Sequence, residues 1–155
     1  MKLFLAVTLT LAAPLLIHAA ELSDIKSVYL LPMSRGLDQY LAERLTSAGV
    51  MTIVTDPKKA DAVFTDSIGG NFEENMATLF EDQTKKSDKA EDSPYQRPAM
   101  QPLSRGKGNI FLVDRKSRNV LWSTFVVPKT SDSRDLSRTA DEITGKLVKA
   151  QGKKK

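Results

Sequence analysis

The sequence predicts one α/β domain: a two-layer sandwich in which a mixed five-stranded sheet packs against two main helices on one face. Three observations support this fold class. Short β-rich runs recur along the chain, a helical repeat of apolar residues separates the first two runs, and a second helical repeat follows the last. Taken in order, the elements read β-α-β-β-loop-β-β-α, and we expect the strand order 2-1-3-4-5.

The first strand is expected at residues 27–32, S-V-Y-L-L-P, which are apolar and end at a proline that cannot continue a β-ladder. A helix follows, because apolar residues recur at intervals of three and four while charged residues occupy the other positions. Gly49 is typical of the residue after a helix. The apolar positions of this helix are Leu37, Tyr40, Leu41, Leu45 and Ala48.

The second strand is expected at residues 51–55 and the third at residues 61–68. Between them, Asp56 and Pro57 are typical of the N-cap and first residue of a single helical turn, which we expect to end at Lys59. A strand, a helix and a strand at this spacing predict a right-handed crossover and parallel pairing.

A long insertion is expected at about residues 71–108, because the chain there turns to glycine, proline and charged residues. Such a composition buries too little apolar surface to fold alone, so we expect a flexible segment within the domain. Its beginning is an exception. Four residues at helical spacing predict a short amphipathic helix, namely Phe72, Met76, Leu79 and Phe80.

The sheet is completed by a hairpin of two β-rich runs, residues 110–113 and 120–127, joined by the polar turn D-R-K-S-R-N. The last helix is predicted by apolar residues at helical spacing, with Gly145 as a weak point that costs about 1 kcal/mol relative to alanine. These apolar residues are Leu136, Ala140, Ile143, Leu147 and Ala150.

Residues 1–20 have the pattern of a secretory signal peptide: one lysine, an apolar run and small residues before Glu21. We therefore expect a single domain at residues 21–150, a basic tail at 151–155, and a secreted or periplasmic protein that does not span a membrane once the signal is cleaved. Since the chain has no cysteine, it has no lipobox and no disulfide.

His18, the only histidine, lies in the expected signal. The mature chain therefore lacks the imidazole and thiol groups of Ser-His-Asp and Cys-His catalysis and of Cys/His zinc sites. We expect no enzyme, no cofactor and no metal. A hydrolase that uses aspartate, serine and lysine is the alternative that composition leaves open.

The net charge is +4, and +3 without Lys2. Acidic and basic residues alternate along most of the chain, which is unlike a nucleic-acid surface, so no nucleic-acid partner is expected. The excess lies in the tail, where Lys153, Lys154 and Lys155 could make weak contact with an anionic polymer.

Two short patterns have both a structural and a chemical interpretation. Residues 104–108, S-R-G-K-G, allow a phosphate-binding nest but also suit a lead-in to a strand, and they lack P-loop spacing. Asp56, Asp61 and Asp66 lie five residues apart, unlike the alternating ligands of a calcium loop. We interpret both patterns as structural.

The last strand of the hairpin is apolar on both faces, so it is either covered twice or presents one face to a partner. We expect one hairpin strand to form a sheet edge that, together with the insertion, binds an envelope protein or a second copy of the chain, with Trp122 as core support. The expected partner-binding residues are Leu121, Ser123, Phe125 and Val127 on the strand, with Arg115, Lys116 and Arg118 in the turn.

The segments A-D-A-V-F-T, residues 60–65, and F-L-V-D-R-K-S-R-N-V-L-W-S, residues 111–123, resemble a small α/β domain of bacterial envelope accessory proteins. This group comprises penicillin-binding-protein activator lipoproteins, the curli-secretion pore protein and the amino-terminal domain of TolB. The resemblance implies a non-enzymatic envelope adaptor or assembly protein that acts through protein-protein binding. A small-ligand or anionic-polymer binding protein is the alternative.

Overall fold

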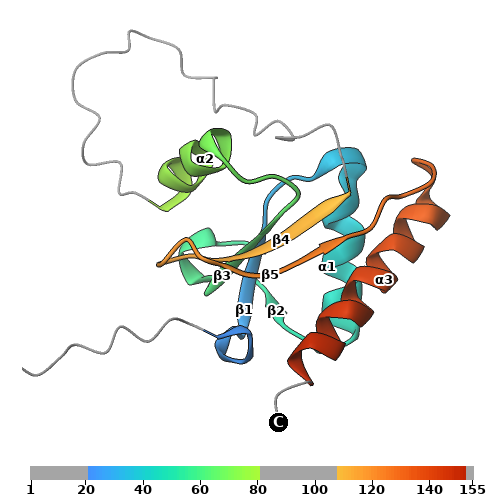
Figure 1. The fold of residues 1–155 in the computed structure, drawn as a ribbon, viewed down its shortest axis with the longest axis horizontal. Helices are drawn as coiled ribbons and strands as arrows, with labels where there is room; N and C mark the ends of the chain where they lie inside the picture. The colour runs from blue at the N-terminus through green and yellow to red at the C-terminus, as the bar shows by residue number, and fades with distance from the viewer. Residues whose placement is uncertain (1–20, 81–107, 153–155) are drawn as a thin grey trace, which may run out of the picture.

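The computed structural model describes residues 21–80 and 108–152, which form one α/β unit (Figure 1). The expected signal peptide, most of the expected insertion and the three terminal lysines lie outside the described residues. The principal elements are β1 (Ser27–Leu30), α1 (Leu37–Ser47), β2 (Thr52–Ile53), β3 (Ala62–Thr65), α2 (Gly70–Phe80), β4 (Asn109–Asp114), β5 (Val120–Phe125) and α3 (Ser133–Gln151).

The five strands form one mixed sheet in the order β2-β1-β3-β4-β5, which confirms the predicted order. β1 pairs in parallel with β2 and with β3, whereas β3–β4 and β4–β5 are antiparallel. The parallel part follows from the crossover through α1, and the antiparallel end follows from the hairpin. β5 is therefore an edge strand.

The main core lies between one face of the sheet and the pair α1 and α3, which pack side by side (Figure 1). Alternate strand residues point into it, including Val28, Phe64 and Leu112, all of which have no exposed surface. They meet the apolar faces of the two helices at the predicted positions, such as Leu41 and Ile143. The predicted sandwich, with two main helices on one face of a five-stranded sheet, is confirmed.

α2 covers part of the opposite face, where a second and smaller core cluster forms (Figure 1). Its Phe72 and Met76 pack against Val63 and Val113, which lie on the neighbouring strands β3 and β4. All four residues of β3 are buried, since β3 has helices on both sides. The predicted short helix at the start of the insertion is therefore α2, and it adds a partial third layer.

Several local predictions can be compared directly. The turn Pro57–Lys59 is a 3-10 helix whose N-cap, Asp56, accepts a hydrogen bond from the Lys58 backbone amide at 3.0 Å. β3 is shorter than expected and ends at Thr65. Within residues 21–80 and 108–152, no helix has the length and apolar content needed to cross a bilayer.

Candidate functional site

Among the described residues, no strand pairs with the backbone groups along the outer edge of β5. Val126 N donates to Gly108 O at 2.8 Å, and Thr124 of β5 lies opposite Ile110 of β4. Thr124 and Val126 therefore direct their backbone amide and carbonyl groups toward β4. In an antiparallel ladder the intervening residues, Ser123 and Phe125, point their amide and carbonyl groups away from β4. One of these groups is partly satisfied, because Lys146 Nζ of α3 donates to Phe125 O at 3.4 Å.

Four residues form an exposed strip on the side of the sheet that carries α2, and we call them the β5 strip: Val120, Ser123, Phe125 and Val127. The cross-strand partners of three of them identify the face, because Val120 lies opposite Val113, Ser123 opposite Phe111 and Phe125 opposite Asn109. The three apolar members are 46%, 61% and 50% exposed, in chain order. The strip therefore contains three of the five large apolar side chains that the structure exposes among its described residues.

The structure brings together three of the four strand residues predicted for this site, Ser123, Phe125 and Val127. Leu121 is different: the β4–β5 register shifts between Leu112 and Val113, and Leu121 packs against the main core. The register shift also places Val120 on the exposed face, which the sequence did not indicate. A β-bulge adds one residue to one strand, so the residues before it point to the opposite face from the one that strict alternation predicts. The alternation of apolar and polar residues in the sequence therefore does not reveal the bulge.

The three basic residues of the hairpin turn have different environments. Arg115 and Arg118 both lie over the ring of Phe80 at the end of α2, at 5.6 and 5.9 Å from its centroid. Arg118 also lies 3.9 Å from a carboxylate oxygen of Glu73, and Arg115 donates to Lys58 O at 2.8 Å. These two arginines therefore attach α2 to the hairpin, whereas Lys116 is exposed at the tip.

The turn itself is stabilised by Asp114, a buried carboxylate that accepts hydrogen bonds from the backbone amides of Lys116 and Ser117. Arg118 has φ +62°, in the left-handed region that favours glycine. Here the contacts of Arg118 with Phe80 and Glu73 offset the conformational cost of about 1–2 kcal/mol.

Trp122 lies on the opposite face of β5 from the strip and packs against the main core. Its indole meets the ring of Phe64 edge to face, with centroids 6.5 Å apart and an interplanar angle of 83°. Such pairs add about 0.5–1.5 kcal/mol beyond the area they bury. Trp122 is thus core support for the edge strand, as the sequence predicted.

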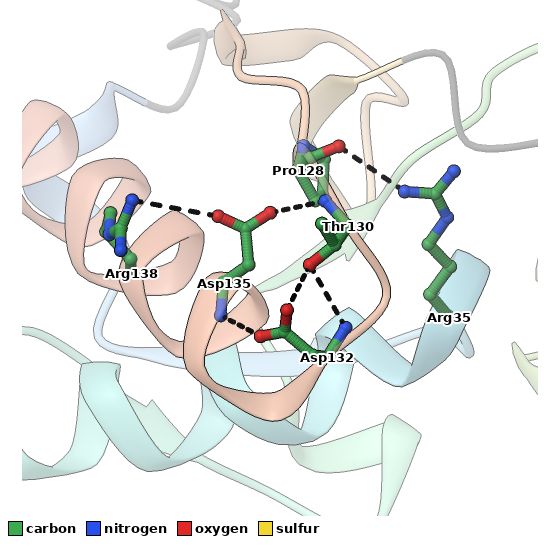
Figure 2. Close-up of polar contacts among 6 residues, drawn as sticks. All are labelled: Arg35, Pro128, Thr130, Asp132, Asp135 and Arg138. Atoms are coloured by element: carbon green, nitrogen blue, oxygen red, sulfur yellow. Dashed lines mark hydrogen bonds and ion pairs between the residues drawn. The ribbon is translucent and has the colours of Figure 1, made fainter.

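The connection from β5 to α3 is held by the polar contacts drawn in Figure 2. Arg35, just before α1, donates to Pro128 O at 3.4 Å, and Thr130 N donates to Asp135 Oδ2 at 2.6 Å. Asp132 is the N-cap of α3 and accepts from the Asp135 amide. The Thr130 hydroxyl and that amide hold the pKa of Asp132 below its usual range. These contacts fix the direction in which the chain leaves the β5 strip.

The three aspartates that might have suggested a calcium site lie in separate places. Asp56 caps a turn, Asp61 bonds to Ser27 and Lys26 at the start of β1, and Asp66 bonds to the Ser34 amide at the other end of the sheet. Among the described residues no group of three potential metal ligands occurs. The hydrogen bonds of Asp56 and Asp61 are those of a turn cap and of a link between two strands.

Ser27 and Asp61 form a hydroxyl–carboxylate pair, with Ser27 Oγ donating to Asp61 Oδ2 at 2.8 Å. Burial raises the pKa of Asp61, but hydrogen bonds from Ser27 and Lys26 and the charge of Arg115 outweigh it and leave the pKa below the usual range. A carboxylate with a lowered pKa is a poor general base at neutral pH. The pair joins the starts of β1 and β3.

Comparison of the chain with protein-family models, with curated proteins and with solved structures finds no match.

Proposed function

We propose that this protein is a secreted or periplasmic adaptor that binds another component of the cell envelope, without catalysis, through the β5 strip and the adjoining strand edge. The observation that carries the proposal is the exposure of Phe125 at the end of an edge strand and of Val127 two residues beyond it. Aromatic and aliphatic side chains of this size gain the most from burial in an interface. An edge strand beside them offers backbone hydrogen bonds to an added strand.

Two features limit uncontrolled pairing at this edge. The register shift beside Leu121 interrupts the ladder, and Lys146 directs its ammonium group to Phe125 O. Bulges and lysine residues are common protections of edge strands against aggregation. The open part of the edge is therefore short, which suits a specific partner better than a growing fibre.

The composition supports binding over catalysis, because beyond residue 18 the chain contains neither histidine nor cysteine. The two hydroxyl–carboxylate pairs described above, Ser27–Asp61 and Thr130–Asp132, both contain an aspartate whose pKa is lowered. Their hydrogen bonds cap a strand and a helix. The secreted location is proposed from the sequence pattern of residues 1–20, and the envelope partner from the resemblance described above.

The test is site-specific photo-crosslinking in cells that produce the full chain. A photoreactive phenylalanine analogue is placed at Phe125 and, as a matched control, at Val148 of α3, which is 46% exposed on a helix away from the strip. We expect one discrete crosslinked product from position 125 in the envelope fraction and none from position 148. Equal products from both positions, or none from position 125, would contradict the proposal.

Two further variants separate packing on the strip from pairing with the edge. Phe125→Ser removes the largest apolar side chain of the strip. Ser123→Pro removes an amide that points away from β4, so it leaves the β4–β5 ladder intact and blocks an added strand. With a photoreactive residue at Val127, we expect Phe125→Ser to abolish the crosslink. Loss of the crosslink in Ser123→Pro as well would show strand addition, and an unchanged yield in both variants would refute the site.

A further inference from the structure

A small crevice lies at the carboxyl ends of the parallel strands β1 and β3. The two strands continue in opposite directions there, because β1 leads to α1 on one face of the sheet and β3 leads to α2 on the other (Figure 1). In open α/β sheets such a divergence opens a crevice in which ligands bind. About 20 Å³ of space is enclosed here, with Ser34, Arg35 and Asp66 as polar neighbours and Leu37, Ile110 and Val126 as apolar ones.

Asp66 is the unusual member of this crevice. It is only 8% exposed, and one of its oxygens, Oδ2, accepts a hydrogen bond from the Ser34 backbone amide at 2.9 Å. The other oxygen, Oδ1, is buried and receives no hydrogen bond. A buried carboxylate oxygen without a donor is unfavourable, and more so when the group is charged. Asp66 has no ion-pair partner among the described residues.

The loop that forms one wall of the crevice is conformationally strained. Arg35 has φ +63° and ψ +14°, in the left-handed region, and Gly36 follows it with φ +71°. This conformation is unfavourable for a residue with a side chain. In this conformation the Arg35 guanidinium donates a hydrogen bond to Pro128 O at 3.4 Å (Figure 2). Strained residues beside an unsatisfied buried group are typical of binding sites.

We propose that this crevice binds the protonated primary amine at the end of a short aliphatic chain, with Asp66 Oδ1 as the acceptor. An ammonium group supplies the missing donor and also the positive charge that offsets the burial of the carboxylate. The enclosed space admits about one non-hydrogen group, because a water molecule requires about 10–15 Å³. The methylene groups next to the amine would lie against Leu37 and Val126, as lysine stems do on apolar surfaces.

Amide chemical shifts of the ¹⁵N-labelled protein test this site directly. n-Butylammonium chloride is the probe, and tetramethylammonium chloride is the control, since it carries the same charge without an N–H donor. We expect saturable shifts at the amides of Ser34 and Asn109 with the first salt and none with the second. Equal shifts with both salts, or no saturation with butylammonium, would overturn the proposal.

Variants that remove one carboxylate each give a second test. Asp66→Asn is expected to weaken butylammonium binding at least tenfold, whereas Asp132→Asn, which makes the same charge change at the N-cap of α3, is expected to leave it unchanged. Equal affinities of the two variants for butylammonium would refute the role of Asp66. If Asp66→Asn does not fold, the comparison of the two salts on the parent protein still tests whether the crevice binds an ammonium group. Replacing butylammonium by N-acetyl-lysine methylamide then distinguishes a lysine side chain from a free amine as the natural source. This site is separate from the β5 strip, so its failure leaves the proposed function standing.

Discussion

Gly108 and Gly145 should respond in opposite directions to the same substitution, alanine. Gly108 opens β4 with φ +88°, and a Cβ there would lie 2.6 Å from Val127 Cγ2 and 2.9 Å from Val126 O. The Val127 side chain is half exposed and can rotate. The Val126 backbone cannot move easily, because its amide donates to Gly108 O at 2.8 Å and its side chain is buried in the main core.

The magnitudes follow from these contacts. A left-handed alanine costs about 1–2 kcal/mol, and overpacking against fixed backbone adds about 1–3 kcal/mol. We therefore expect Gly108→Ala to lower the free energy of unfolding by about 2–4 kcal/mol. Gly145 lies inside α3, and apart from its chain neighbours and its own helix backbone nothing lies within 4 Å of its ideal Cβ, so Gly145→Ala should raise the free energy of unfolding by about 0.8–1.0 kcal/mol.

Urea unfolding followed by circular dichroism measures both changes. The midpoint should move down for Gly108→Ala and up for Gly145→Ala, with the same dependence on urea concentration as the parent. A Gly108→Ala midpoint equal to that of the parent would refute the described end of the hairpin. A lower midpoint for Gly145→Ala would refute the open environment described for α3.

Two further predictions concern α2 and the N-cap of α3. Met76→Ala should lower the free energy of unfolding by about 2–4 kcal/mol in the same urea assay, because Met76 is fully buried in the second core cluster. A loss below about 0.5 kcal/mol would show that α2 does not pack on the sheet. Because the pKa of Asp132 is lowered by folding, its contribution to stability is complete above its ordinary pKa of 3.8 and is lost as the pH falls through the folded value. Asp132→Asn keeps the cap without a titrating group, so thermal unfolding should be less pH-dependent below about pH 4 in this variant than in the parent, and identical profiles would contradict this role.

The order of the strands was predictable because it follows from local signals. The helical repeat before Gly49 forces a crossover between β1 and β2, and the D-R-K-S-R-N turn forces an antiparallel hairpin. The short helix α2 was predictable for the same reason, from the spacing of Phe72 and Met76. In each case one segment of sequence contains the whole pattern.

The features that were not predictable depend on contacts between distant segments. Arg115 and Arg118 have the composition of an exposed turn, and only the position of Phe80, more than thirty residues earlier, shows that they stack on a ring. The burial of Asp66 likewise depends on the loop before α1, whose Ser34 amide lies beside it. A sequence signal was present for Asp66, since it directly follows a fully buried strand, where a polar residue faces a potential crevice.

The exposure of the β5 strip follows from the unequal number of helices on the two faces of the sheet. Adjacent strands lie about 4.8 Å apart, so five strands span about 19 Å, whereas one helix with its side chains is about 10–12 Å wide. On one face, α1 and α3 together are wide enough to cover the sheet. On the other face α2 packs over Leu31, which directly follows β1, and over Val63 of β3 and Val113 of β4, and leaves the face of β5 open. Phe125 and Val127 are therefore exposed because one helix cannot span the sheet, and a partner that adds apolar surface beside α2 would complete this layer.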